Sequence, residues 1–343
     1  MKPYFQYRKK IKLVILSIVG SLVLLQPLVA QDFQLSQYDA PPLFLNPAMT
    51  GLFNGQYRIH AHYRNQWRSI SSKPFTTTGI SFDMPIKKFG LGVQVMNYQA
   101  GSGNYNVFNI LFSSAYDLSI DADENHHLSF GAQIGFTQKN IDVNKLTYGN
   151  QFSSKNGGDF DISLPSGELY NNVQFSIFNL NAGVLYYYAK NNKFLNPFIG
   201  LSVFNINQPT ETFYQTQNKL SARFYLHGGT KINISEKIQL LPKFIYMKQL
   251  SAEQISVSIL MHYFMKTADT YLIFGPTYRN KDAAIIEAGI NKGAYIVRVS
   301  YDVTISSLKK VTQSRGGFEL SATYTIRKAK PNNSFTNLTC PRL

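Results

Sequence analysis

The sequence is poor in cysteine, in charged residues and in long apolar runs. Its single cysteine, Cys340, excludes an intramolecular disulfide scaffold and a zinc site built from several cysteines. Charged residues make up 15% of the chain, whereas an average soluble protein has about 25%. After residue 30, no stretch approaches the ~20 consecutive apolar residues that a membrane-spanning helix needs. Disulfide-stapled domains and membrane-helix bundles are therefore poor candidates.

Residues 1–30 have the pattern of an export signal. Basic residues precede the short apolar run Leu13–Leu25, and Ala30 offers a small side chain at the expected cleavage point. The run is short for a membrane helix, and no cysteine stands just after it as a lipoprotein signal would require. The pattern favours cleavage near Gln31 over retention as an anchor, and it predicts an exported protein.

The rest of the chain is basic, but its charge is scattered. Five of the 34 lysines and arginines lie in residues 1–30 with none of the 19 acidic residues, which leaves a formal net charge of +10. Nucleic-acid-binding proteins usually gather their basic residues in one patch or on a known fold. We therefore expect no nucleic acid as a partner, and the excess fits anionic lipid headgroups or an acidic partner.

Aromatic side chains and a two-residue alternation are abundant. The chain has 22 tyrosines and 25 phenylalanines. Successive side chains of a strand point to opposite faces, so alternation predicts a strand between two unlike environments. The segment after Gln56 shows this well, because Tyr57, Ile59, Ala61 and Tyr63 alternate with Arg58, His60, His62 and Arg64.

The alternation recurs in about 14 segments of the length that a tilted barrel strand requires. In hydrocarbon every backbone donor must be paired, which leaves helices and closed barrels as the spanning structures. Low charge, many aromatics and an export signal therefore predict an all-β fold, a transmembrane antiparallel β-barrel over residues 55–326. A soluble sandwich would alternate too, but no fixed-period repeat indicates a propeller. Tyrosines near strand ends suit the interfacial girdles of such barrels.

The lengths of the connections predict which end of the barrel faces outward. The longest interruptions, Asn140–Asn171, Asn207–Lys219 and Val303–Arg315, follow the fifth, seventh and thirteenth expected strands. If both termini are periplasmic, these odd-numbered connections face outward, where such barrels carry their longer loops.

Two segments fall outside the expected barrel. Residues 31–54 contain Pro41, Pro42 and Pro47, which disfavour regular structure. We expect this irregular segment to begin in the periplasm and to tuck into the barrel mouth or pack across its periplasmic end. Residues 327–343 form a tail that we expect within reach of periplasmic envelope proteins.

The stretch around the first strand also carries a specific motif. Its pattern, Q-Y followed by P-P-x-x-x-N-P-A-x-T-G and then R-x-x-x-x-x-R-x-Q-W, resembles the PorP/SprF family of outer-membrane proteins of the type IX secretion and gliding apparatus. The matching residues are Gln37, Tyr38, Asn46, Pro47, Ala48, Thr50, Gly51, Arg58, Arg64, Gln66 and Trp67. The Cys-Pro-Arg-apolar ending at Cys340 resembles the family as well.

The resemblance implies a non-enzymatic outer-membrane role. Family members work with secreted cell-surface proteins, such as adhesins with a C-terminal sorting domain, and with periplasmic components of the secretion or motility machinery. The protein would then support export of these proteins or hold them at the surface. We expect the outward loops, chiefly Asn140–Asn171, and the barrel wall to recognise the exported partner.

No motif for catalysis, cofactor or metal binding stands out. His60 and His62 could face one ion, but no third ligand lies nearby in sequence. No G-x-S-x-G elbow occurs, although a barrel hydrolase could assemble an acid–base cluster across strands. Arg58 and Arg64 could bind an anion in the lumen, but we favour ion pairs with carboxylates such as Asp83 or Glu287.

Two alternatives to the secretion role remain open. The first is an outer-membrane transporter or porin that passes small or hydrophobic solutes through a partly plugged lumen. The second is an outer-membrane hydrolase, which would need a cross-strand acid–base cluster at one end of the barrel.

Overall fold

The computed structural model describes residues 34–68, 73–101, 103–154, 158–170, 172–190, 194–213 and 218–326. The chain divides into two units, Met1–Asp32 and Phe33–Leu343, and the described residues all belong to the second. The predictions for the leader, the tail and Cys340 therefore lie outside the described residues. Within them, no helix is both long enough and apolar enough to cross a membrane.

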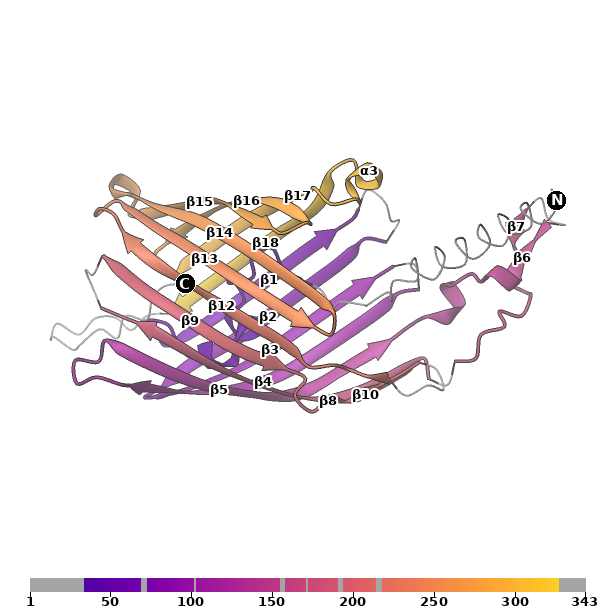
Figure 1. The fold of residues 1–343 in the computed structure, drawn as a ribbon, viewed down its shortest axis with the longest axis horizontal. Helices are drawn as coiled ribbons and strands as arrows, with labels where there is room; N and C mark the ends of the chain where they lie inside the picture. The colour runs from indigo at the N-terminus through magenta and orange to yellow at the C-terminus, as the bar shows by residue number, and fades with distance from the viewer. Residues whose placement is uncertain are drawn as a thin grey trace, which may run out of the picture. The chain divides into compact units, whose positions relative to one another are not determined.

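Fourteen antiparallel strands of the described chain close into a barrel (Figure 1). They are β1 (Tyr57–Gln66), β2 (Phe75–Ile86), β3 (Phe89–Ala100), β4 (Tyr105–Ser119), β5 (His126–Asn140), β8 (Gln174–Tyr188), β9 (Leu195–Phe204), β12 (Arg223–Asn233), β13 (Ile238–Gln249), β14 (Ala252–Met265), β15 (Thr270–Arg279), β16 (Ala283–Lys292), β17 (Tyr295–Thr304) and β18 (Arg315–Ile326). Pairing of β1 with β18 completes the ring, from Tyr57↔Ile326 to Gln66↔Gly317. The sequence prediction of a closed barrel with about 14 strands is confirmed.

The two ends of the barrel differ in their connections. One end, the long-loop end, carries β6 (Phe152–Ser153) with β7 (Asp159–Phe160), β10 (Thr210–Glu211) with β11 (Asn218–Lys219), and helix α3 (Lys309–Thr312). The other, the short-turn end, has brief connections such as residues 87–88 between β2 and β3 and residues 293–294 between β16 and β17. The long interruptions read from the sequence thus share one end.

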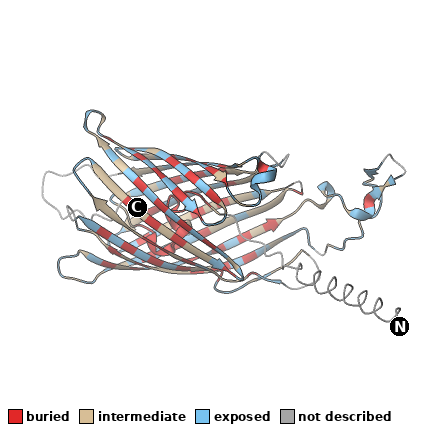
Figure 2. Ribbon diagram, turned by 45° about the horizontal axis from the view of Figure 1, so that its top comes forward, coloured by how far each residue is buried: buried red, intermediate tan, exposed pale blue. Residues whose placement is uncertain are grey.

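Exposed and buried residues alternate along the strands (Figure 2). In β1, Tyr57, Ile59 and Tyr63 face outward, while His60 and Arg64 are buried inside the barrel. This matches the expected apolar outside and polar inside.

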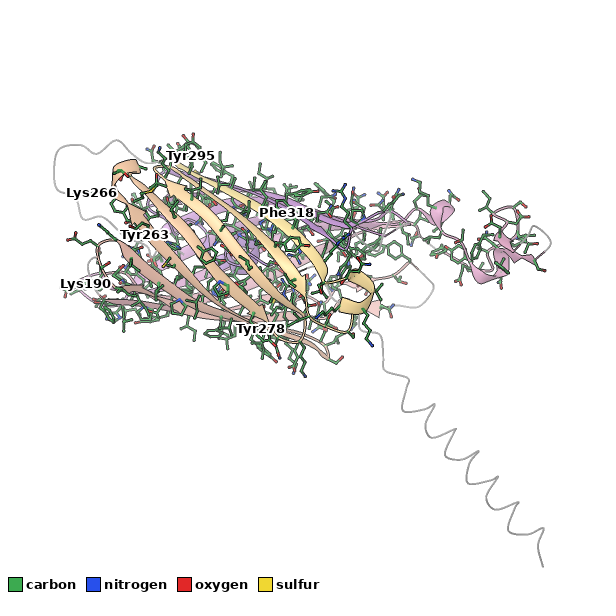
Figure 3. All side chains as sticks on the ribbon, turned by 90° about the horizontal axis from the view of Figure 1, so that it is seen from above. Lys190, Tyr263, Lys266, Tyr278, Tyr295 and Phe318 are labelled. Carbon is green, nitrogen blue, oxygen red and sulfur yellow. The ribbon has the colours of Figure 1, made fainter. Side chains whose placement is uncertain are left out.

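Aromatic side chains flank the outward apolar surface at both ends (Figure 3). Exposed Tyr263 and Tyr295 lie toward the short-turn end, and exposed Tyr278 and Phe318 lie toward the long-loop end. Rings in these two positions match the interfacial girdles of membrane barrels.

Residues 34–56, here called the plug, run through the barrel interior. Residues 35–51 are buried apart from the half-buried Phe44. The plug contains helix α2 (Pro42–Leu45) and the 3-10 turn η1 (Pro47–Met49), each with a proline in its first turn, where the missing N–H costs no hydrogen bond. Its irregular backbone is tolerated because it is enclosed by protein.

The plug runs from the long-loop half of the lumen to the short-turn end. Ser36 contacts Arg64 and Arg279, which lie near the long-loop ends of β1 and β15. Gly51 packs against Gly90, at the short-turn end of β3. The expected periplasmic origin of this segment stays a prediction, because residues 1–33 are not described.

Candidate functional site

The centre of the plug lies directly on glycines of the inner wall. Gly131 of β5 and Gly183 of β8 are directly paired on neighbouring strands, and together they leave a notch in the inner wall. A Cβ atom on Gly131 would overlap the backbone of Pro47 and Ala48, and one on Gly183 would overlap the side chain of Asn46. Only glycine permits this close approach of two backbones.

Asn46 fastens this turn to three strands. Its Nδ2 donates to the carbonyls of Val184 at 3.1 Å and Leu201 at 3.2 Å, and it lies 3.1 Å from Nε2 of His227. Its Oδ1 accepts from the N–H of Ala48 at 2.9 Å and caps η1. One fully buried amide therefore shapes the turn and joins it to β8, β9 and β12.

The end of the plug is held by an arginine–carboxylate pair. Arg58 donates to Asp83 from Nε at 2.9 Å and from Nη2 at 2.6 Å, and it also reaches the carbonyl of Met49 at 3.2 Å. Asp83 accepts in addition from the N–H of Gly51 at 2.7 Å. Gly51 adopts a positive φ of 74°, which glycine reaches without strain. The predicted Arg58–Asp83 pair is confirmed.

A buried ionic cluster holds the start of the described plug. Arg64 donates to Glu319 at 2.6 Å and to Asp302 at 2.8 Å. Glu319 also accepts from the backbone N–H groups of Ser36 at 2.8 Å and Gln37 at 2.6 Å. Arg64 thus pairs with carboxylates inside the barrel, as expected, but its partners are Glu319 and Asp302, because the register places it opposite Glu319.

A second ionic cluster surrounds Asp39, the one charged residue of the described plug before Arg58. Asp39 contacts Lys243 at 2.6 Å and Arg298 at 3.0 Å, and Arg298 also contacts Glu287 at 3.1 Å. These two cations compensate the buried charge of the Asp39 carboxylate. The Lys243 ammonium also lies 5.2 Å from the ring centre of Tyr38.

The remaining motif residues support these contacts. The Thr50 hydroxyl donates to the carbonyl of Pro47 at 2.7 Å within the plug. Gln66 accepts from Nε of Arg64 at 3.4 Å. Trp67 stands apart at the long-loop end, where its ring meets Phe75 edge-on at 4.7 Å. The motif read from the sequence is therefore mainly a set of plug contacts.

Sequence reasoning missed half of this site. It did not single out Gly131, Asp39, Arg298 or Glu319. The sequence signal that could have found these residues is a charged side chain or a glycine at an inward-facing position of a strand.

His60 and His62 lie side by side on β1. Their rings are 5.8 Å apart. Nδ1 of His60 lies 2.9 Å from the hydroxyl of Thr323, and Nε2 of His62 lies 3.2 Å from Glu319. Among the described residues, no three histidine, cysteine or acidic side chains are grouped so as to hold an ion.

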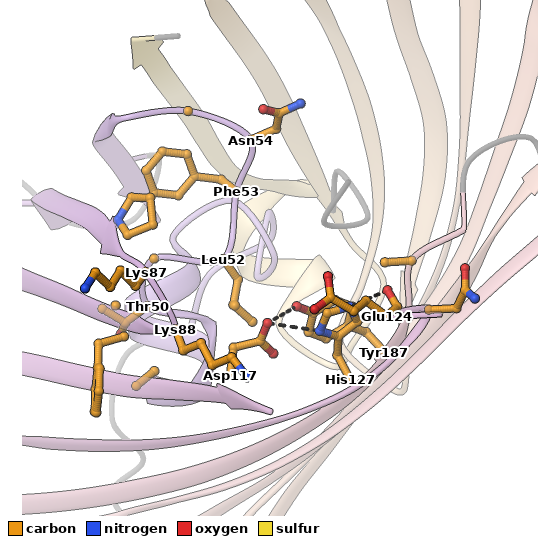
Figure 4. Close-up of a pocket in the computed structure, with 18 of the residues that line it drawn as sticks. Thr50, Leu52, Phe53, Asn54, Lys87, Lys88, Asp117, Glu124, His127 and Tyr187 are labelled. Carbon is orange, nitrogen blue, oxygen red and sulfur yellow. Dashed lines mark hydrogen bonds and ion pairs between the residues drawn. The ribbon is translucent and has the colours of Figure 1, made fainter. Parts of the chain in front are cut away.

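A cavity with a volume of about 410 Å³ opens at the short-turn end, between the plug and the wall of β3, β4, β5 and β8 (Figure 4). Its charged lining is mixed and includes Lys87, Lys88, Asp117 and Glu124. His127 lies 3.0 Å from Asp117 through Nδ1 and 2.9 Å from the carbonyl of Glu124 through Nε2. Both ring nitrogens are occupied, so this pair braces the turn between β4 and β5.

Comparison with solved structures shows the barrel fold. The chain is 12% identical to the CymD monoaromatic hydrocarbon channel, with a TM-score of 0.50 over 87% of this chain and 95% of that one. It is 9% identical to the Ralstonia pickettii toluene transporter TbuX, with a TM-score of 0.50 over 84% and 94% of the two chains. At these identities the likeness concerns the fold alone.

A search of curated proteins finds no match. The model of one family, described as type IX secretion system membrane protein PorP/SprF, matches residues 28–324. That range includes the motif, the plug and nearly the whole barrel. The chain therefore belongs to the PorP/SprF family of type IX secretion system membrane proteins.

Proposed function

We propose that this protein is a non-enzymatic outer-membrane component of the type IX secretion and gliding machinery. Family membership implies association with secretion components, and the barrel fold supports an outer-membrane location. Its role is to support export or surface attachment of secreted proteins, such as adhesins with a C-terminal sorting domain. A cleaved leader at residues 1–30 would deliver it to the envelope.

The occupied lumen is the observation that carries this proposal. Three motif residues join the plug to the wall. Asn46 of the plug donates to the carbonyl of Val184 on the wall, while Arg58 and Arg64 of the wall donate to Met49 and Ser36 of the plug. A barrel that uses its motif to hold its own segment inside is poorly suited to open diffusion. Its loops and its two ends are then left to meet other proteins, and periplasmic components would approach the short-turn end.

The connection between β5 and β8 is the best candidate for recognition of an exported partner. It is the longest connection at the long-loop end and forms its own small sheet of β6 and β7. A rigid scaffold that carries one elaborated loop is a common arrangement for binding.

Replacement of residues 142–171 by a Gly-Ser-Gly turn tests this assignment. We expect surface proteins to be lost from the cells into the medium, while the barrel still inserts, because the strand ladder is untouched. The matched control shortens the β9–β12 connection, residues 206–221, in the same way. Unchanged retention after removal of residues 142–171 would dismiss the assignment.

A second candidate function is passage of small hydrophobic solutes. Part of the inner wall is apolar, with Leu241, Ile245 and Ile273 in one buried cluster with Leu45 and Met49 of the plug. A lumen lined in this way could admit an apolar molecule if the plug shifted. Solute uptake by liposomes that contain the purified protein tests this candidate, and the secretion role predicts little uptake.

A further inference from the structure

The described part of the β5–β8 connection, residues 141–154 and 158–170, is a folded element that we call the arm. The Tyr148 and Tyr170 hydroxyls are 2.8 Å apart, and Nε2 of Gln151 donates to the carbonyl of Leu164 at 3.0 Å. The N–H of Asp161 donates to the carbonyl of Gln151 at 2.8 Å. These contacts join the two halves of the arm, so its surface has a defined arrangement.

This surface is unusually apolar. Ile162 and Leu169 are each 74% exposed, and Phe152 is 51% exposed. The rings of Phe152 and Phe160 meet edge-on at 5.5 Å. Together the exposed apolar side chains, here called the arm patch, are Phe152, Phe160, Ile162, Leu164 and Leu169. Exposed apolar groups gathered on one element commonly mark an interaction site.

Lipid does not account for the arm patch. On the outer face of β5 and β8, the last large apolar pair before the arm is Phe136 with Phe178. Beyond that pair, the outward positions are polar: Gln138, Asn140, Gln174 and Ser176. On these two strands, polar side chains therefore separate the apolar band of the barrel from the arm, which lies beyond the strand ends in Figure 1.

Strand addition is also a poor explanation for the arm patch. The N–H of Phe152 already donates to the carbonyl of Gly149, and that of Phe160 to the carboxylate of Asp159 at 2.8 Å. These donors are not available to a third strand at the edge of the β6–β7 pair. The exposed side chains are then the main feature that the arm offers a partner.

Charge indicates what kind of partner fits. The arm carries Asp159, Asp161 and Glu168, while its described lysine, Lys145, is paired with Asp142 at 2.8 Å. Hydrogen bonds from Ser163 hold the pKa of Asp161 below its usual value, so this carboxylate is ionised at neutral pH. The described surface of the arm is therefore acidic as well as apolar, although the chain as a whole is basic, with a formal net charge of +15.

We propose that the arm patch binds an apolar segment of the exported partner that is flanked by lysine or arginine. The apolar side chains would be covered by the partner, and the three carboxylates would select its basic flanks. This inference rests on the proposed function and gives the recognition loop a specific surface and a partner chemistry.

Purified full-length protein in nanodiscs tests the proposal with two fluorescent peptides of equal leucine and phenylalanine content. One carries three lysines and the other three glutamates. We expect the lysine peptide to bind at least tenfold more tightly, with an affinity that falls as salt rises.

The double variant Asp159→Lys/Asp161→Lys should lose this preference, and Phe152→Ser/Phe160→Ser should weaken binding at least tenfold. Equal binding of the two peptides would overturn the proposal.

Retention of surface proteins by cells separates this inference from the proposed function. The matched control, Ile305→Ser/Leu308→Ser, removes exposed apolar groups from another long loop. Loss of retention in Phe152→Ser/Phe160→Ser but not in the control supports the inference. If only replacement of residues 142–171 abolishes retention, the inference about the arm patch is wrong and the proposed function stands. If neither change matters, both the arm patch and the assignment of recognition to the β5–β8 connection are wrong. Association of purified copies through the arm, seen by native mass spectrometry, would reassign the patch to self-contact.

Discussion

Glycines on the inner wall set how closely the plug can approach the barrel. Gly131 and Gly183 leave room where other residues would place a side chain, and Asn46 and Pro47 fill that room. The position of the plug thus depends on the absence of a few Cβ atoms as much as on hydrogen bonds.

The first prediction concerns these glycines. Gly131→Ala and Gly183→Ala should each lower the free energy of unfolding by about 1–3 kcal/mol, because the added methyl overpacks a closed contact. Urea titration of the protein in lipid vesicles measures the change. Gly149→Ala is the control, since a Cβ there meets nothing within 4 Å. Equal stability of all three variants would contradict the account.

The second prediction concerns the cluster at the start of the plug. Glu319→Gln removes one of the two carboxylate charges that Arg64 faces and weakens an acceptor for two plug N–H groups. Loss of one partner of a buried ion pair costs about 3–5 kcal/mol. We expect faster proteolysis at residues 34–40 than in the wild type. The exposed Glu236→Gln serves as control and should behave like the wild type.

At the scale of elements, the plug and the wall are held by different sets of bonds. The pairs Arg64–Asp302, Arg298–Glu287 and Arg58–Asp83 each join residues outside residues 34–52. Lys243 and Arg298 also pair with Asp39 of the plug, and Arg298 keeps Glu287 as a second partner. The wall can therefore keep most of its charge pairing without the plug.

The third prediction follows from this division. Deletion of residues 34–52 should leave a closed barrel that conducts ions, whereas the intact protein should conduct little. Single-channel recording in planar bilayers distinguishes the two, with the intact protein as its own control. Equal conductance with and without residues 34–52 would show that the plug does not block the lumen.

The sequence predicts the elements better than their contacts. Alternation in segments such as Tyr57–Arg64 defines strands and faces, because burial on one side of a strand leaves a two-residue period. The Arg58–Asp83 pair could be predicted from the sequence, because the two residues lie on neighbouring strands of one hairpin. The Arg64–Glu319 pair joins the first and last strands, and no local pattern fixes that register.

The route of the plug was beyond the sequence for a similar reason. Prolines and glycines between Pro41 and Gly55 predict irregular backbone but not direction. The direction follows from contacts such as Ser36 with Asp302 and Gly51 with Asp83, which depend on the closed barrel.

At the scale of the whole molecule, the long-loop end and the short-turn end should face opposite sides of the membrane. The fourth prediction uses Cys340→Ser as background. A membrane-impermeant maleimide should label Ser163→Cys on the arm in intact cells. It should label Lys237→Cys, in a short turn, only after the outer membrane is permeabilised. The reverse pattern would invert the proposed orientation and remove the arm from the cell surface.

Affinity isolation of the tagged protein from native outer membranes, with mass spectrometry of what accompanies it, tests the central claim most directly. The account predicts enrichment of secreted surface proteins together with secretion or motility components, relative to an unrelated tagged barrel of the same membrane. Replacement of residues 142–171 should remove the surface proteins and leave the machinery components. Recovery of the same proteins as with the unrelated barrel would contradict a role in type IX secretion.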